Sequence, residues 1–283
     1  MTRARLLISC ADRPGLVALV TGWLARRGAN IIDLAQHSTA PEAGGRFFMR
    51  IEFELARAVD ADELRAELDS LASAAAMSWT LNDATLPKRL AILVSRPEHC
   101  LLDLLWRQRR GELDARLTLV ASNHELHRAD VEAFGVPYHY VPVGAGGRDQ
   151  AEARMLELLR GNVDVVVLAR YMQILSARFL ERVAVPVINI HHSFLPAFAG
   201  AHPYRQAHER GVKVIGATAH YVTAELDAGP IIEQNVARVS HADDPASLER
   251  LGADLERTVL ARAVRWHLED RVLLDGARTV VFA

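Results

Sequence analysis

Two side chains that can donate hydrogen bonds and exchange protons stand two residues apart, where a predicted strand ends. The apolar run 183–190 indicates a buried strand, and Asn189 and His191 lie at its end. Alternate residues of a strand leave the same face, so both side chains should face one ligand. Asparagine supplies an amide donor, and histidine is the side chain most easily protonated near neutral pH. Asn-x-His is also typical of a hydrogen-bonded turn.

A carboxylate on a stiff turn follows farther along the chain. Asp227 stands in the segment Leu-Asp-Ala-Gly-Pro, where the glycine and the proline favour a tight turn. His191, His192, His220 and Asp227 could together hold a metal ion. Consecutive strand residues point to opposite faces, however, so His191 and His192 could not easily share one ion. We therefore expect no metal.

The region that carries these residues alternates between strand and helix patterns. Strand-like runs occupy 89–95, 117–122, 138–141 and 163–169, and helical apolar spacing occupies 101–110, 125–134 and 150–160. This alternation predicts a doubly wound, mostly parallel α/β domain with helices on both faces of the sheet. Strands at 214–223 and 231–239 are separated only by a loop, so the sheet should end in mixed pairing before a helix at 245–268. Ligands bind such sheets beyond the carboxyl ends of the strands, where Asn189 and His191 lie.

An earlier region reads as a smaller domain of its own. Strands at 4–10, 30–39, 46–54 and 77–82 and helices at 16–27 and 60–71 follow the β-α-β-β-α-β order of ferredoxin-like domains. Within 46–54, phenylalanine, methionine and isoleucine alternate with Arg50 and Glu52, which predicts one face exposed to water. We therefore predict domains at 1–83 and 89–283, joined by a linker at 84–88.

The composition excludes several classes of protein. The 283 residues include 33 basic and 35 acidic side chains, so no positive surplus points to nucleic acid. Cys10 and Cys100 lie far apart, which argues against a disulfide framework. No apolar run is long enough for a signal peptide or a membrane span. We expect a cytoplasmic protein without a membrane partner.

Several separated motifs, taken in order, resemble the formyltransferase family that uses N10-formyltetrahydrofolate. The matching residues are Asn189, His191, Ser193, Leu195 and Pro196, then Gly216, Thr218, His220, Asp227 and Gly229. Residues 168–175 are similar to the segment that forms the folate pocket of that family. The double histidine, the Arg-Tyr-Met-Gln sequence at 170–173 and the N-terminal domain resemble the family's hydrolytic branch in particular.

This resemblance implies a set of site residues and a reaction. Asn189 and His191 would stabilise the oxyanion formed when water attacks the formyl amide, and Asp227 would take the proton from water. Thr218 and His220 would orient Asp227. The substrate-binding set would comprise Arg170, Tyr171, Met172, Gln173, Ile174, Leu175, His192, Ser193, Thr218, His220 and Gly229. The products would be formate and tetrahydrofolate, with no metal or other cofactor, because the folate is itself the substrate.

The loop after the strand 89–95 favours water over a phosphorylated acceptor. A phosphate at a helix N-terminus needs free backbone N–H groups and no fixed negative charge. In this loop Pro97 lacks an N–H, and Glu98 places a carboxylate there. Two alternatives remain: a formyltransferase with an unidentified amine acceptor, and a regulatory protein that only senses folate.

The N-terminal domain resembles an ACT domain through the sequences Asp-Arg-Pro-Gly at 12–15 and Gly-Ala-Asn-Ile at 28–31. The resemblance implies that a small amino acid, glycine or methionine, binds at a junction between two copies. The residues expected there are Asp12, Gly15, Leu16, Asn30 and Ile31. It also implies a homo-oligomer, a dimer or tetramer, although the domain could serve assembly alone.

Overall fold

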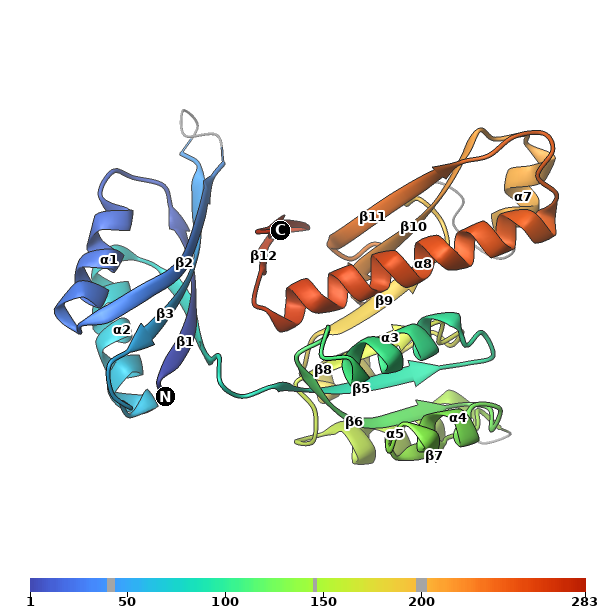
Figure 1. The fold of residues 1–283 in the computed structure, drawn as a ribbon, viewed down its shortest axis with the longest axis horizontal. Coiled ribbons are helices and arrows are strands. Elements are labelled where there is room, and N and C mark those ends of the chain that lie inside the picture. The colour runs from blue at the N-terminus through green and yellow to red at the C-terminus, as the bar shows by residue number, and fades with distance from the viewer. Residues whose placement is uncertain (40–43, 145–146, 197–202) are drawn as a thin grey trace. The chain divides into compact units, whose positions relative to one another are not determined.

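The computed structural model describes residues 1–39, 44–144, 147–196 and 203–283 (Figure 1). The chain divides into two compact units. The small unit comprises Met1–Pro87 with Asp270–Asp275 and Val280–Ala283, and the large unit comprises Lys88–Glu269 with Gly276–Thr279. Within the described part of the chain, no helix has the length and apolar character needed to cross a membrane.

The small unit has the predicted β-α-β-β-α-β order. Its elements are β1 (Arg3–Ala11), α1 (Leu16–Arg26), β2 (Ala29–Ser38), β3 (Arg46–Leu55), α2 (Ala61–Ala75) and β4 (Ser78–Asp83). The sheet has the order β2-β3-β1-β4, and each neighbouring pair is antiparallel. Buried leucines of α1 and α2 pack with the apolar side chains of β1 and β3. Both helices cover one face of the sheet (Figure 1).

The other face of β3 is not the exposed surface that the alternation predicted. Arg50 and Glu52 are only 1% and 6% exposed. Arg50 Nη2 lies 2.8 Å from Glu52 Oε2, and its Nη1 lies 2.8 Å from Asp33 Oδ2. Arg5 joins this network through Glu52 and also approaches Asp270, a residue of the C-terminal segment that belongs to this unit. The prediction was wrong because charged partners on β1, β2 and the C-terminal segment compensate these side chains, so that their burial is possible, whereas alternation shows only that they are polar.

Replacing Glu52 with glutamine should destabilise the protein by about 3 kcal/mol, because it removes the negative charge that Arg50 and Arg5 share in a buried network. Burial alone would raise the pKa of Glu52, but Arg50 and Arg5 outweigh it and lower that pKa. The stability that ionised Glu52 contributes is therefore present above its unfolded pKa of about 4.3. It disappears as the pH falls through the lower pKa of the folded state. Urea denaturation of both proteins from pH 7 to pH 3 measures the difference. Glu54→Gln, an exposed neighbour on β3, is the matched control.

The large unit is the predicted mostly parallel α/β domain. Its elements are β5 (Lys88–Val94), α3 (His99–Arg109), β6 (Ala115–Ser122), α4 (Arg128–Ala133), β7 (Tyr138–Tyr140), α5 (Gly147–Leu159), β8 (Val165–Ala169), α6 (Ala177–Val183), β9 (Val187–His191), α7 (Pro203–Glu209), β10 (Val214–Tyr221), β11 (Ile231–Arg238) and α8 (Pro245–Leu268). The sheet order is β11-β10-β9-β8-β5-β6-β7. β10 runs antiparallel to both β9 and β11, and the other neighbouring strand pairs are parallel, which confirms the mixed end.

Four features differ from the sequence-based assignment. The helices α6 and α7 were not predicted, and neither was the two-stranded sheet of β12 (Val272–Asp275) and β13 (Arg278–Val281). The strand predicted at 183–190 begins only at Val187, because Val183 ends α6 and Ala184 turns the chain with φ 53°. A continuous apolar run does not distinguish a helix end from a strand start.

The order of the strands places the site. From β5 the chain proceeds outward through β6 and β7, then returns across β5 to β8 and proceeds the other way. The switch in direction therefore lies between β5 and β8, and ligands of open α/β sheets bind beyond the strand ends at such a point. The residues that follow β5 and β8 are Ser95 and Arg170.

Candidate active site

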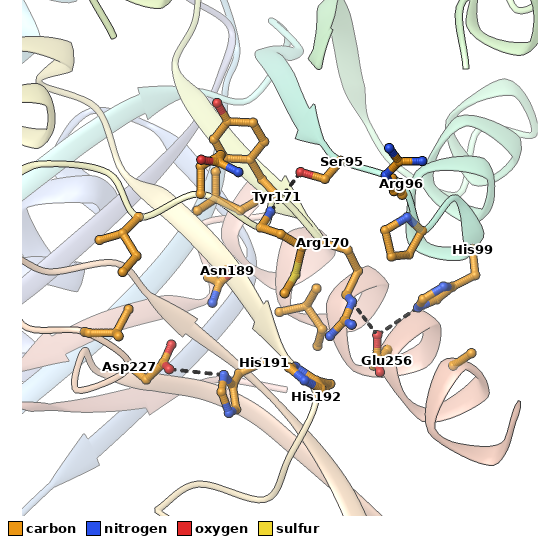
Figure 2. A pocket seen from close by; sticks show the side chains of 18 of the residues that line it. Ser95, Arg96, His99, Arg170, Tyr171, Asn189, His191, His192, Asp227 and Glu256 are labelled. Atoms are coloured by element: carbon orange, nitrogen blue, oxygen red, sulfur yellow. Dashed lines mark hydrogen bonds and ion pairs between the residues drawn. The ribbon is translucent and has the colours of Figure 1, made fainter. Parts of the chain in front are cut away.

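A cavity of about 1400 Å³ lies at this edge of the sheet. Its walls come from the segments that follow β5, β8 and β9, from the loop between β10 and β11, and from α8 (Figure 2). Asn189, His191 and Asp227 all line it, as do Arg170–Leu175, His192 and His220. The structure thus brings the three expected catalytic residues into one cavity with most of the expected substrate-binding set.

Antiparallel pairing of β9 with β10 brings together the side chains of a polar cluster. This polar cluster consists of Asn189, His191, His220 and Asp227. Asn189 stands opposite His220 in the register, and His191 stands opposite Thr218. Asn189 Nδ2 lies 3.2 Å from His220 Nε2. The two-residue period of each strand therefore puts Asn189, His191 and His220 on the same side of the sheet edge.

Asp227 reaches this cluster from the loop between β10 and β11. Its Oδ2 lies 3.3 Å from His191 Nδ1, and its Oδ1 lies 3.7 Å from His220 Nε2. The contacts with His191 and then with His220 hold the pKa of Asp227 well below its usual range, so the carboxylate stays ionised. His191 Nε2 is buried and has no hydrogen-bond partner in the described part of the structure. The cluster thus leaves one ring nitrogen of His191 available for a ligand.

Gly229 shapes the turn that presents Asp227, which itself has a positive φ of 54°. A Cβ on Gly229 would lie 1.7 Å from the carbonyl oxygen of Tyr221. Gly229 does not itself line the cavity. Its role is therefore to let two backbone segments approach closely and so place the carboxylate.

Replacing Gly229 with alanine should lower kcat by about tenfold to a hundredfold, because the turn must move and take Asp227 away from His191. The melting temperature should also fall, since the added Cβ displaces buried backbone. Steady-state kinetics and thermal unfolding measure both effects. Gly144→Ala is the matched control, because a Cβ at Gly144 meets nothing within 4 Å. Wild-type kinetics in Gly229→Ala would contradict the prediction.

Thr218 and Ser193 support the loop after β9 and do not line the cavity. The Thr218 hydroxyl donates to the Ser193 carbonyl oxygen at 2.8 Å and accepts from Leu195 N at 3.1 Å. Both residues are buried, at 0% and 4% exposure. The prediction that Thr218 orients Asp227 was wrong, because its hydroxyl holds the residues that follow His191 and His192.

The segment Arg170–Leu175 forms one wall of the cavity, as expected. Ser95 holds this wall: its N–H donates to the Arg170 carbonyl oxygen at 3.2 Å, and its Oγ accepts from Met172 N at 3.0 Å. Met172 and Ile174 are each 55% exposed. Two large apolar side chains at a cavity wall offer a surface for a flat heterocycle.

The sequence reasoning missed Glu256, a buried carboxylate from α8. Its Oε2 lies 2.8 Å from His99 Nε2 and 3.4 Å from Arg170 Nε (Figure 2). Its Oε1 accepts a hydrogen bond from the Tyr204 hydroxyl at 2.7 Å. Burial raises its pKa, but the contacts with His99 and Arg170 outweigh burial and lower it. A signal existed, because this glutamate lies on the apolar stripe of an amphipathic helix.

Glu98 does not occupy the place expected of it. Its side chain is exposed and is not part of the cavity wall, whereas Ser95, Arg96, Pro97 and His99 are. The carboxylate beside this loop is that of Glu256. The sequence pattern correctly located the loop after β5. The carboxylate near that loop, however, belongs to Glu256 on α8, more than a hundred residues later in the chain.

His99, Cys100 and Glu256 form the single group in the described ranges whose ligand atoms lie close enough for a metal, within 4.8 Å of one another. Two features oppose a cation there. The Arg170 guanidinium already neighbours Glu256, and burial, followed by the charge of Glu256, raises the pKa of the Cys100 thiol. Thiols bind metals as thiolates, so this group does not fit a resident ion.

The residues expected to bind an effector do not come together within one chain. Asp12 lies beside the start of β3, where its N–H donates to the Gly45 carbonyl oxygen, and Gly15 and Leu16 begin α1. Asn30 pairs with Glu54 at the other end of β3, and Ile31 pairs with Phe53. The helix α1 carries the chain from one end of the sheet to the other, so the two groups occupy opposite ends.

Comparison with known proteins covers both units. The family described as formyl transferase matches residues 88–264, and the ACT domain matches residues 4–69. The formyltetrahydrofolate deformylase of Mycobacterium tuberculosis (strain ATCC 25618 / H37Rv) is 56% identical over 280 residues, which are 98% of this chain and 90% of the relative. That of Bacillus subtilis (strain 168) is 51% identical over 282 residues, or 99% of this chain and 94% of the relative. The crystal structure of a formyltetrahydrofolate deformylase from Pseudomonas syringae pv. tomato has 48% identity and a TM-score of 0.94, covering 100% of this chain and 95% of that chain.

These matches include the N-terminal domain as well as the domain that carries the polar cluster. A relationship at this identity over nearly the whole length of both proteins joins the two domains in the same order. The chain therefore belongs to the formyltetrahydrofolate deformylases, a branch of the formyl transferase family.

Proposed function

We propose that the chain hydrolyses the formyl amide of N10-formyltetrahydrofolate to formate and tetrahydrofolate. The observation that carries the proposal is the cluster of Asn189, His191 and ionised Asp227 on one cavity wall. Amide hydrolysis needs donors for a developing oxyanion and a group that accepts a proton from water, and this cluster contains both.

Asn189 and His191 are the donors in this proposal. When the oxygen of water bonds to the formyl carbon, the carbonyl oxygen becomes an oxyanion. Asn189 Nδ2 donates one hydrogen bond to it. His191, in its imidazolium form, donates Nδ1–H to Asp227 and Nε2–H to the oxyanion. The unpartnered state of Nε2 supports this assignment.

Asp227 is the proton carrier. The carboxylate accepts a proton from the attacking water and returns it to N10 as the bond between carbon and N10 breaks. A carboxyl group whose pKa is well below its usual range is a weak base but a strong acid. It therefore holds the proton only briefly and transfers it readily to the leaving nitrogen.

The pterin ring of the folate is assigned to the wall formed by Arg170–Leu175. Met172 and Ile174 supply exposed apolar surface there, and Leu226, which is 64% exposed, adds apolar surface from the loop that carries Asp227. In this proposal the ring lies between the Arg170–Leu175 segment and the loop that carries Asp227. The formyl group then lies beside the polar cluster. A ligand-bound structure with the pterin elsewhere would contradict the placement.

The decisive experiment measures formate release from N10-formyltetrahydrofolate with no amine acceptor present. We expect stoichiometric formate and tetrahydrofolate. Turnover that begins only when an amine is added would establish the alternative, a formyltransferase. Folate binding without turnover under either condition would indicate a protein that only senses folate.

For the small unit we propose a homo-oligomer, a dimer or tetramer, in which glycine or methionine binds between two copies. The separation of Asp12, Gly15 and Leu16 from Asn30 and Ile31 supports this, because an antiparallel pair of units would bring the two groups together. β2 is an edge strand, with Ile32 42% exposed, so it offers a surface to a second copy.

Glycine or methionine should change the rate by a factor that corresponds to about 1–3 kcal/mol of coupling. Asn30→Ala should remove this response and leave the basal rate unchanged, because Asn30 lies outside the unit that carries the polar cluster. Rates with and without each amino acid, together with sedimentation at several protein concentrations, provide the measurement. If the protein is an oligomer whose rate changes with neither amino acid, the small unit serves assembly only.

A further inference from the structure

Helix α8 contains a notch that holds the tyrosine at the start of α7. Gly252 has no side chain, and a Cβ there would lie 1.9 Å from Tyr204 Oη and 2.1 Å from Tyr204 Cζ. One turn later, Glu256 Oε1 accepts a hydrogen bond of 2.7 Å from the same hydroxyl. Residues i and i+4 of a helix share a face, so the notch and the acceptor lie side by side. The ring of Tyr204 thus packs directly against the helix backbone.

Tyr204 is held on its other sides as well. It is 8% exposed and belongs to a buried cluster with Ala207, Ile215 and Leu248, which joins α7 to β10 and α8. Glu256, its acceptor, is 1% exposed and is itself fixed by His99 and Arg170. A buried hydroxyl with a charged acceptor makes a strong and directional hydrogen bond. The position of the ring is therefore determined by contacts on α7, α8 and β10.

Contacts continue from this ring to the catalytic histidine. The ring centroids of Tyr204 and His192 are 6.1 Å apart, and those of His192 and His191 are 5.2 Å apart. Burial, followed by the charge of Arg170, lowers the pKa of His192 to about 3, so this ring stays uncharged near neutral pH. His192 therefore acts as a neutral spacer between Tyr204 and His191.

We propose that Tyr204, seated in the notch at Gly252 and held by Glu256, is a positioning residue for His191. The hydroxyl proton of Tyr204 is donated to Glu256, so the tyrosine acts on the reaction through its ring contact with His192. A misplacement of about 1 Å at a catalytic group can lower the rate about a hundredfold. The folate wall at Met172 and Ile174 lies on a different segment, so displacing Tyr204 should change the rate more than KM. The inference rests on the hydrolytic function proposed above.

A double-mutant cycle tests the seat, by which we mean the packing of Tyr204 in the notch at Gly252. Gly252→Ala should lower kcat by about tenfold to a hundredfold and leave KM within about twofold, because the added Cβ displaces Tyr204. In a Tyr204→Ala background the same Gly252→Ala change should have no further effect on kcat, since the Cβ enters vacated space. An equal loss in both backgrounds, or no loss in the wild-type background, would overturn the proposal. Gly22→Ala in α1 is the matched control, because its Cβ would make only an ordinary 3.6 Å contact.

The histidine ring signals in NMR spectra separate this inference from the proposed function. The signals of His191, assigned with His191→Asn, should shift in Gly252→Ala and stay unchanged in Gly22→Ala, whatever reaction the protein performs. If the wild-type protein releases no formate but the His191 signals still shift in Gly252→Ala, the proposed function is refuted and the positioning role of Tyr204 is retained. Unshifted His191 signals in Gly252→Ala would refute the seat.

Tyr204→Phe covers the case in which Gly252→Ala does not fold. The ring remains in the notch but loses its bond to Glu256, so kcat should fall by about three- to tenfold with KM unchanged, the effect of one hydrogen bond. The His191 signals should shift in the same direction as in Tyr204→Ala. Wild-type kcat and wild-type His191 signals in Tyr204→Phe would overturn the role of Glu256 and of the seat.

Discussion

Asp227→Asn is expected to lower kcat for formate release by about a hundredfold to ten-thousandfold while folate binding stays nearly intact. An amide cannot carry the proton from water to N10, and it no longer pairs with the His191 imidazolium. The side chain barely changes in size, so the loop that Gly229 shapes should keep its course. Single-turnover formate release measures the chemical step, and calorimetric titration with tetrahydrofolate measures binding.

The matched control is Glu225→Gln, which removes an exposed carboxylate from the same loop and the same cavity wall. It should retain activity close to that of the wild type, because Glu225 is not in the polar cluster. Turnover at the wild-type rate in Asp227→Asn would refute the assignment. Because the pKa of Asp227 is held well below its usual range, its protonation does not explain any loss of activity above about pH 4.

Asn189→Ala is expected to lower kcat by about a hundredfold or more and to leave KM nearly unchanged. The oxyanion exists only in the transition state, so a donor to it contributes to kcat rather than to substrate binding. Loss of one such donor typically costs about 3–4 kcal/mol of transition-state stabilisation. Steady-state kinetics at saturating and limiting folate measure the two constants.

Asn189 Nδ2 also lies 3.2 Å from His220 Nε2, so a second variant must separate the two roles. Asn189→Asp keeps the shape of the side chain but replaces the donor with a negative charge. It should be at least as inactive as Asn189→Ala, because a carboxylate repels the oxyanion. An active Asn189→Asp variant would contradict the donor role, and an effect confined to KM would show that Asn189 binds only the ground state.

Features that depend on neighbouring residues, such as the bounds of helices and the face of a strand, could be predicted from the sequence. The helix predicted at 245–268 has these bounds in the structure, since Asp244 caps it, Pro245 begins it and its buried leucines and valines recur at helical spacing. Asn189 and His191 could be paired from a two-residue period alone. The motif order around Asp227 likewise indicated the family before any contact was known.

The contacts that turn these residues into a site depend on which segments meet. Only the antiparallel pairing of β9 with β10 sets Asn189 opposite His220, and only the loop between β10 and β11 brings Asp227 to His191. Thr218, which belongs to the same motif, has its hydroxyl on the loop after β9 instead. A motif records which residues occur together but not which of them the backbone directs into the cavity.

Periodicity shows that a face is polar or apolar, but it does not show what covers that face. For this reason the two domains, most of their strands and helices and the family could be predicted from the sequence, whereas the burial of Arg50 and Glu52 was predicted wrongly and Glu256 was missed. Each of these three charged side chains is buried against partners from distant segments, such as Asp33 on β2 or His99 on α3. Charge compensation depends on neighbours in three dimensions, so the places of these buried charges follow from the contacts between distant segments and not from local sequence.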